Sequence, residues 1–134
     1  MPDQRHLRVL EAAEALTVMV LGAAERVDGH LAPGIRGQLL RATSSISANI
    51  AEAAGLGTQV NFLRQLRIAL ASANEVGSHL RVLRSSGALD GLTVARLDAT
   101  RRVVCKMLVG LIAAIESRLA EAAPADGRRR RRSS

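Results

Sequence analysis

Apolar residues recur in steps of three and four along four segments of the chain, and this is the spacing of one face of an α-helix. In the first segment the inward-facing stripe consists of Leu10, Ala13, Leu16, Val20, Ala24 and Val27. The pattern predicts helices over residues 4–27, 33–54, 58–84 and 92–122. The sequence shows no strand-like alternation. Four helices joined by short loops predict an all-α fold, an antiparallel four-helix bundle in up-down-up-down order.

Residues that favour helix ends stand between these segments. Asp3, Thr58 and either Asp90 or Thr93 are the predicted N-caps of the first, third and fourth helices. Pro33 suits the first turn of the second helix, where its missing N–H is not needed. The predicted helix boundaries therefore rest on capping residues as well as on periodicity.

Composition supports a single helical domain followed by a tail. The 134 residues include one Phe and no Trp or Tyr, so the core must consist of Leu, Val, Ile, Met and Ala. Such side chains pack readily between helices. Residues 1–123 are therefore predicted to form one bundle domain. Residues 124–134 have almost no apolar content and a block of like charge, which predicts a disordered Arg-rich tail.

Two helices carry features that bear on packing. Small residues at positions 43–45 predict a close crossing of the second helix with a neighbour. Gly77 interrupts the third helix at a cost of about 1 kcal/mol relative to Ala, and this predicts that another backbone passes close to it. The first helix carries further apolar residues, Leu7, Val18 and Leu21, outside its main stripe. It is therefore expected to contact neighbours on more than one side.

Residues able to perform chemistry are few and scattered. Glu75 and His79 lie one turn apart, with Glu52 as a possible third ligand, but this is weak evidence for a metal site and we interpret the pair as a feature of the helix surface. His6 falls in an expected fraying end and His30 in a loop, neither within a nucleophile motif. We therefore expect no catalytic residue, no metal and no cofactor.

The compartment follows from cysteine usage and hydropathy. The single Cys105 cannot form an internal disulfide, which fits a reducing compartment. The first residues lack the apolar stretch of a signal peptide, and no segment reaches the roughly 18 apolar residues of a membrane span. The expected location is the cytoplasm, away from the membrane.

Charge is the plainest remaining feature. The formal net charge is +7, and the positive side chains are Arg except for Lys106. Five of the arginines form one run at residues 128–132. A flexible polycation of this kind binds nucleic acid through its phosphates. A solvated tail that keeps the protein soluble, or a GC-rich genome that favours Arg codons, would explain the same composition.

The candidate nucleic-acid contacts are the basic residues of the tail and of the helices. In the tail they are Arg128, Arg129, Arg130, Arg131 and Arg132, and on the helices Arg36, Arg41, Arg64, Arg67 and Lys106. Four further arginines of the helices, Arg81, Arg84, Arg101 and Arg102, could join a patch with them. Phe62 is the only aromatic residue, so contact with the backbone or shape of a nucleic acid is expected in place of base stacking.

One stretch is more specific than periodicity explains. Residues 38–53, which read QLLRATSSISANIAEA, resemble the signature helix of the four-helix bundle proteins encoded in 23S ribosomal RNA intervening sequences. Residues 61–75 look like the third helix of that family, and residues 107–112 resemble its final helix. Ser47 stands where the family usually has Pro, and Leu40 where it usually has Arg.

The resemblance implies a homo-oligomer, typically a pentameric barrel, in which each chain is one bundle. A related branch is the accessory variability determinant (Avd) of diversity-generating retroelements, which associates with a reverse transcriptase and with nucleic acid. Asn49 and Glu52 belong to the signature, and they either face a partner or bond neighbouring helices or subunits. The predicted function is a non-catalytic oligomeric scaffold that binds RNA or DNA electrostatically. The alternative is a structural or protein-interaction bundle without a nucleic-acid role.

Overall fold

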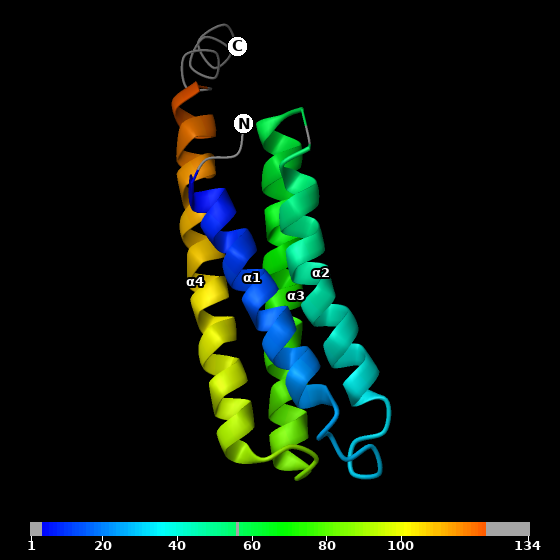
Figure 1. The fold of residues 1–134 in the computed structure, drawn as a ribbon. Coiled ribbons are helices and arrows are strands. Elements are labelled where there is room, and N and C mark those ends of the chain that lie inside the picture. Colours follow the sequence, from blue (N-terminus) through cyan, green and yellow to red (C-terminus); the bar gives the residue numbers. More distant parts are fainter. Residues whose placement is uncertain (1–3, 56, 123–134) are drawn as a thin grey trace, which may run out of the picture.

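The computed structural model describes residues 4–55 and 57–122, and they form four long helices that alternate in direction (Figure 1). The described residues contain no strand. The predicted all-α four-helix bundle is therefore confirmed. The helices are α1 (Gln4–Ala24), α2 (Ile35–Ala53), α3 (Gln59–Ser85) and α4 (Gly91–Ala122).

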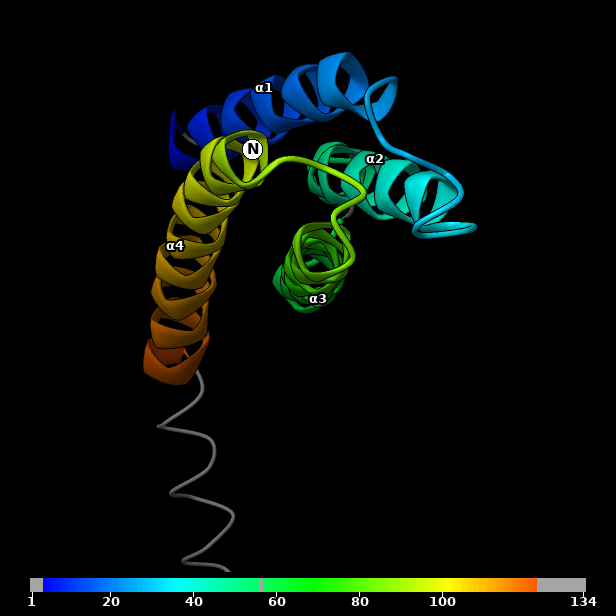
Figure 2. The same cartoon turned by 90° about the horizontal axis from the view of Figure 1, so that it is seen from below.

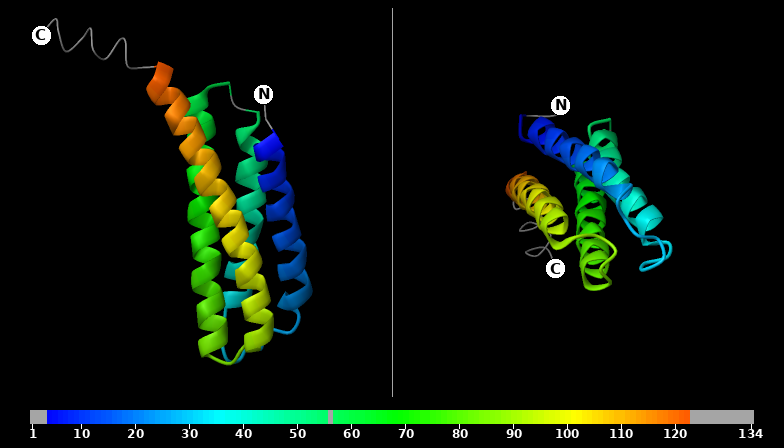
Figure 3. Two further views of the ribbon diagram at one scale, coloured as in Figure 1. Left: turned by 90° about the vertical axis from the view of Figure 1, so that its left-hand side faces the viewer. Right: turned by 60° about the horizontal axis from the view of Figure 1, so that its bottom comes forward.

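Each helix packs against two others, in the cyclic order α1, α2, α3, α4 and back to α1. Figure 2 looks along the bundle and shows this order, with α2 and α4 on opposite sides. Figure 3 shows that α4 runs obliquely across the bundle. One end of the bundle holds the end of α1, the start of α2, the end of α3 and the start of α4. This end is called the 86–90 end below, after the loop that joins α3 to α4.

The core is aliphatic and follows the predicted stripes. Most of the predicted inward positions are buried, and the exceptions, such as Leu10 and Leu70, are half-buried at the edge of the core. The largest side chains sealed from solvent belong to all four helices and include Leu16, Leu39, Ile46, Ile50, Leu66, Leu80, Leu83, Leu108 and Ile115.

The start of α1 is anchored to the core. His6 is 2% exposed, its Nε2 lies 2.7 Å from the carbonyl oxygen of Ile50 in α2, and its ring packs against that of Phe62 in α3. The expectation that His6 lies in a fraying end is therefore wrong. The imidazole ring of His6 is therefore part of the interior of the bundle, which is otherwise mostly aliphatic.

Two of the predicted N-caps have capping geometry. The Thr58 hydroxyl accepts a hydrogen bond from the Asn61 N–H at 3.2 Å. The Asp90 carboxylate accepts bonds from both the N–H and the hydroxyl of Thr93, at 2.9 and 2.7 Å, so Asp90 caps α4. These bonds lower the pKa of Asp90. Asp3 lies outside the described residues.

The connection between α1 and α2 is longer than predicted. Helix α1 ends at Ala24, and Val27 stays buried within the following turn. The Asp28 N–H donates to the Ala88 carbonyl at 2.9 Å, which ties this connection to the 86–90 loop. Pro33 precedes α2, because Gly34 takes a left-handed conformation, with φ of 78°, before the helix begins at Ile35.

Gly77 faces a side chain, and the prediction of a close backbone is wrong. A Cβ atom at position 77 would lie 2.7 Å from Cζ of Arg101, which reaches across from α4. The Arg101 Nε donates to Asp98 at 2.7 Å, and its Nη1 donates to the Ala73 carbonyl at 3.5 Å. The glycine therefore makes room for a largely buried guanidinium between α3 and α4.

Candidate functional site

The basic residues predicted on the helices do not form one patch. Arg36 and Arg41 are exposed on the first turns of α2, near the 86–90 end. Arg64 and Arg67 are exposed on the first turns of α3, at the opposite end, and Lys106 is exposed near the middle of α4. The predicted set is therefore distributed over three helices and both ends of the bundle.

Two of these arginines have guanidinium groups that contact neighbouring parts of the bundle. Arg67 of α3 pairs with Glu116 of α4 at 2.9 Å, in a bridge whose two side chains are half exposed. The Arg41 guanidinium folds back along its own helix, 3.3 Å from where a Cβ at Gly37 would lie. Exposed ion pairs contribute little to stability, but Glu116 offsets the positive charge of Arg67.

The signature residues Asn49 and Glu52 have different surroundings. The Asn49 Nδ2 donates to the carbonyl oxygen and the hydroxyl of Ser45, at 2.7 and 2.9 Å. The Ser45 hydroxyl in turn lies 2.9 Å from the Ser72 hydroxyl of α3. Asn49 thus belongs to a hydrogen-bond network between α2 and α3, where small side chains allow the predicted close contact. Glu52 is exposed, and its side chain forms no hydrogen bond or ion pair with the described residues, whereas its backbone carbonyl accepts from the Gly55 N–H at 3.0 Å.

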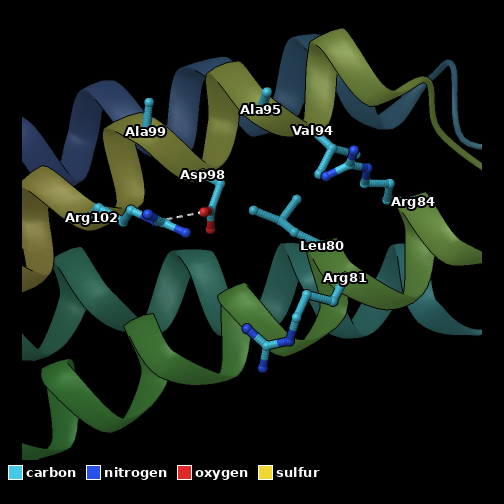
Figure 4. A pocket seen from close by; sticks show the side chains of 8 residues that line it. All are labelled: Leu80, Arg81, Arg84, Val94, Ala95, Asp98, Ala99 and Arg102. Atoms are coloured by element: carbon cyan, nitrogen blue, oxygen red, sulfur yellow. Dashed lines mark hydrogen bonds and ion pairs between the residues drawn. The ribbon is translucent and has the colours of Figure 1, made fainter.

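A groove lies between α3 and α4 near the 86–90 end, and Figure 4 shows its side chains. Its volume is about 480 Å³. Leu80 and Val94 are buried, being 1% and 5% exposed, and they form its apolar floor. Charged side chains surround this floor. The lining residues are Leu80, Arg81, Arg84, Val94, Ala95, Asp98, Ala99 and Arg102, and together they define the α3–α4 groove.

The only carboxylate of the α3–α4 groove is already paired. Asp98 accepts hydrogen bonds from Arg101 Nε at 2.7 Å and from Arg102 Nε at 2.8 Å. Burial raises the pKa of Asp98, but the hydrogen bonds and positive charges of Arg101 and Arg102 outweigh burial and lower it. Asp98 is therefore ionised at neutral pH and neutralised by its own helix.

The arginines that α3 contributes to the groove have no such partner. Arg81 and Arg84 are exposed, and neither forms an ion pair or hydrogen bond with another side chain that the structure describes. In Figure 4 the Arg84 guanidinium extends across to Val94 and the Arg81 guanidinium lies beside α3, and neither is joined to the Asp98 carboxylate. The groove therefore carries a positive charge that the folded chain does not neutralise.

The sequence identified the arginines of this region but not which of them are buried and which are exposed. Arg101 is largely buried against Gly77, whereas Arg81 and Arg84 are open to solvent, and helical spacing alone does not separate them. Asp98 was missed. Its position three and four residues before Arg101 and Arg102 is the signal that identifies it, because such pairs meet on a helix surface.

The other titratable groups do not assemble a catalytic or metal centre. His79 Nε2 lies 3.4 Å from Glu75 Oε1, an i,i+4 pair on α3. Among residues 4–55 and 57–122, no group of three or more His, Cys, Asp or Glu side chains could hold a metal ion. Burial raises the pKa of the Cys105 thiol, even though Arg101 lies 3.6 Å from its sulfur, so the thiol is protonated at neutral pH.

Two further predictions concern the Arg-rich tail and the membrane. The arginines at positions 128–132 lie outside the described residues, so their role stays a prediction. No helix in the described part of the chain is both long and apolar enough to cross a membrane.

The fold and surface define an antiparallel four-helix bundle with scattered exposed cations and an arginine-rimmed groove between α3 and α4. Residues 5–110 match the family model of the 23S rRNA-intervening sequence protein, which covers most of the chain. The chain belongs to this family, as its signature helix indicated.

A solved structure that shares the fold comes from a bacterial protein. It is a protein of unknown function from the S23 ribosomal protein family of Bacteroides thetaiotaomicron, and it superposes with a TM-score of 0.76 at 23% sequence identity. The alignment covers 82% of this chain and 99% of that one. No curated protein sequence matches the chain.

Proposed function

We propose that this protein is a non-catalytic, homo-oligomeric helical scaffold that binds RNA or DNA through phosphates. The observation that carries the proposal is the unneutralised positive charge of the α3–α4 groove, where Arg81 and Arg84 have no acidic partner among the described residues. The net charge of +7 and the ribosomal RNA named in the family description point in the same direction. Phosphate contacts of this kind position a nucleic acid without reading its sequence.

The oligomeric part of the proposal rests on the outward faces of two helices. On α1 and the turn that follows it, residues 7, 11, 14, 18, 21 and 25 recur in steps of three and four and form one exposed stripe. Its apolar members are Leu7, Val18 and Leu21, which are 49%, 69% and 56% exposed. Its other members, at positions 11, 14 and 25, are glutamates. We call this the α1 stripe.

Helix α4 carries a matching stripe of opposite charge. Residues 99, 103, 106, 110, 113 and 117 are exposed and follow the same spacing. Val103 is 54% exposed, Lys106 supplies positive charge, and Gly110 and Ala113 are small enough to let another helix approach closely. We call this the α4 stripe.

These two stripes are complementary, since one is apolar and acidic and the other apolar and basic. The α1 stripe of one copy packed on the α4 stripe of the next would be a head-to-tail contact, which closes into a ring when the rotation allows. The family resemblance makes a pentamer the proposed closure. Five copies on one ring would multiply weak phosphate contacts.

A reverse transcriptase is a candidate protein partner. The support is the resemblance of residues 48–52, which read ANIAE, to the signature that the family shares with Avd. The test is co-purification of tagged full-length protein with a reverse transcriptase from the same genome, if one lies beside its gene. Absence of such a gene neighbour, or no co-purification with one that is present, would contradict this partner.

The binding proposal is tested by fluorescence anisotropy with a labelled 20-nucleotide single-stranded RNA and with a duplex DNA of equal length. Affinity should fall steeply between 50 and 200 mM salt, because phosphate contacts release counterions. Deleting residues 128–132 should flatten this dependence. No binding near physiological salt would contradict the proposal and would favour the protein-interaction bundle, for which the exposed α1 and α4 stripes are the supporting observation.

A further inference from the structure

We infer that the α3–α4 groove is a seat for one phosphate and its adjoining sugar from a nucleic-acid strand. This inference rests on the proposed function and goes further by assigning a site on the folded bundle. The general charge of the chain gives no such site, because a tail and scattered cations act on any nearby phosphate. The groove differs because its charge, shape and apolar floor occur together.

The charge of the groove comes from guanidinium groups that are free to take a ligand. Arg81 and Arg84 are one turn apart on α3, where side chains three residues apart are neighbours on the helix surface. Neither has an acidic partner in the part of the chain that the structure describes. A guanidinium presents two parallel N–H donors, which match two oxygens of a phosphate.

The opposite wall adds a third guanidinium that is held in place. Arg102 of α4 is bound to Asp98 at 2.8 Å through its Nε, and this leaves its terminal nitrogens available at the rim. Arg101 bonds to the other oxygen of the same carboxylate. With Asp98 shared between two arginines, the single acidic group of the groove does not cancel Arg81 and Arg84.

The dimensions and floor of the groove select the size and kind of ligand. A volume of about 480 Å³ falls within the range of small-ligand pockets, so it holds about one nucleotide unit and excludes a duplex. Leu80, Val94 and Ala95 offer apolar surface between the charged walls. The carbon face of a ribose can contact this floor while its phosphate meets the arginines.

The groove and Ala122, the last described residue before the Arg-rich tail, lie at opposite ends of α4. The groove lies at the start of α4, and the tail follows the far end of that helix, beyond Ala122. The 27 residue steps from Ala95 to Ala122 span about 40 Å at 1.5 Å per step. Removing charge at the groove and deleting the tail are therefore independent tests.

The experiment compares two variants of the full-length chain that lose the same charge. R81Q/R84Q removes the free guanidiniums of the groove. R5Q/R8Q is the matched control, since Arg5 and Arg8 are exposed, three residues apart, and without an ion pair among the described residues on α1. All four side chains are exposed, so folding should be retained, and circular dichroism and the oligomer mass verify this.

The measurement is anisotropy of a fluorescein-labelled 20-nucleotide single-stranded RNA over a series of salt concentrations. Loss of two phosphate contacts in R81Q/R84Q should reduce the slope of log K against log salt by about 1.4 and weaken binding about tenfold at 0.1 M salt. R5Q/R8Q should change the affinity by about twofold or less. Equal losses in the two variants would overturn the groove as a site while leaving nucleic-acid binding intact.

Two other outcomes distinguish this inference from the proposed function. If the unmodified chain fails to bind RNA near physiological salt, both the groove and the proposed function fail. If poly-glutamate displaces the RNA as effectively per charge as unlabelled RNA, and R81Q/R84Q abolishes poly-glutamate binding, the groove takes an acidic protein segment and the inference is overturned.

Discussion

The α2–α3 interface contains hydrogen-bonded polar side chains, whereas the outward faces of α1 and α4 expose apolar ones. Between α2 and α3, the Ser45 and Ser72 hydroxyls meet at 2.9 Å and Asn49 adds two further hydrogen bonds, away from most solvent. On the outward faces, Val18 and Val103 are 69% and 54% exposed. Polar groups thus lie inside the bundle where apolar ones are usual, and apolar groups lie outside.

The two regions bear on different properties of the protein, namely the alignment of its helices and its contact with other molecules. A buried hydroxyl pair bonds only when the two helices have one relative alignment, so it fixes the register of α2 against α3. An exposed apolar stripe has no partner among the described residues of its own chain, and such a surface favours binding to another molecule. The interior network therefore contributes to specifying the fold, and we propose that the outer stripes specify an assembly.

The largest expected effect follows from breaking an outer stripe. Val103→Glu places a negative charge in the α4 stripe, opposite the glutamates of the α1 stripe of the next copy, and should convert the ring into single chains. Size-exclusion chromatography with light scattering measures the mass. Val60→Glu is the control, because Val60 is 64% exposed on α3, outside both stripes, and this variant should remain assembled. Equal masses for both variants would contradict the stripe assignment.

The next effect compares apolar residues of the two regions directly. Ile46 is fully buried in α2, so Ile46→Ala should lower the free energy of unfolding by about 3 kcal/mol. Val18→Ala, at an exposed position, should change it by less than about 0.5 kcal/mol once the chains are dissociated. Urea titrations in the Val103→Glu background measure both values. A large loss for Val18→Ala would show that α1 buries this residue within one chain.

A smaller effect tests the interior network. Ser72→Ala removes the hydroxyl that Ser45 bonds across the interface and should destabilise the bundle by about 1 kcal/mol. Ser78→Ala is the control, because Ser78 is exposed on the same helix and should change stability by less than about 0.5 kcal/mol. Chemical denaturation gives both values, and equal changes would remove the special role of the network.

The smallest effect concerns Asp98, the acidic group of the α3–α4 groove. The pKa of Asp98 is lowered in the fold, so its contribution to stability is present above the unfolded value of about 3.9 and is lost as pH falls through the folded value. The difference in unfolding free energy between the unmodified chain and Asp98→Asn should be constant from pH 7 to 5 and shrink below pH 4. A constant difference down to pH 2 would contradict the pairing with Arg101 and Arg102.

Periodicity predicted the fold well because every helix of the bundle buries one stripe. Residues such as Ala13, Leu16 and Val20 were assigned to the core from spacing alone, and they are fully buried. The end of α1 was placed three residues too late, since Val27 is buried in a turn and so continues the apolar pattern of the helix. A pattern of apolar positions indicates which residues are buried, but it does not show whether a buried residue belongs to the helix or to the turn that follows it.

The candidate site was only partly accessible from sequence. Its arginines were visible as charges, but the groove exists because α3 and α4 place positions 81 and 98 side by side, and this depends on their register. Gly77 shows the same limit. Its helix-breaking character signalled a close contact, while the identity of that contact, Arg101, depends on how α4 lies across α3.

We propose that one assembly of this chain carries nucleic acid. Sedimentation velocity with a fluorescein-labelled 20-nucleotide RNA tests this proposal. We expect the RNA to sediment with a particle of five chains of 14.2 kDa at 100 mM salt. At 500 mM salt it should sediment with the coefficient of free RNA. RNA that sediments alone at 100 mM, or together with a single chain, would contradict it.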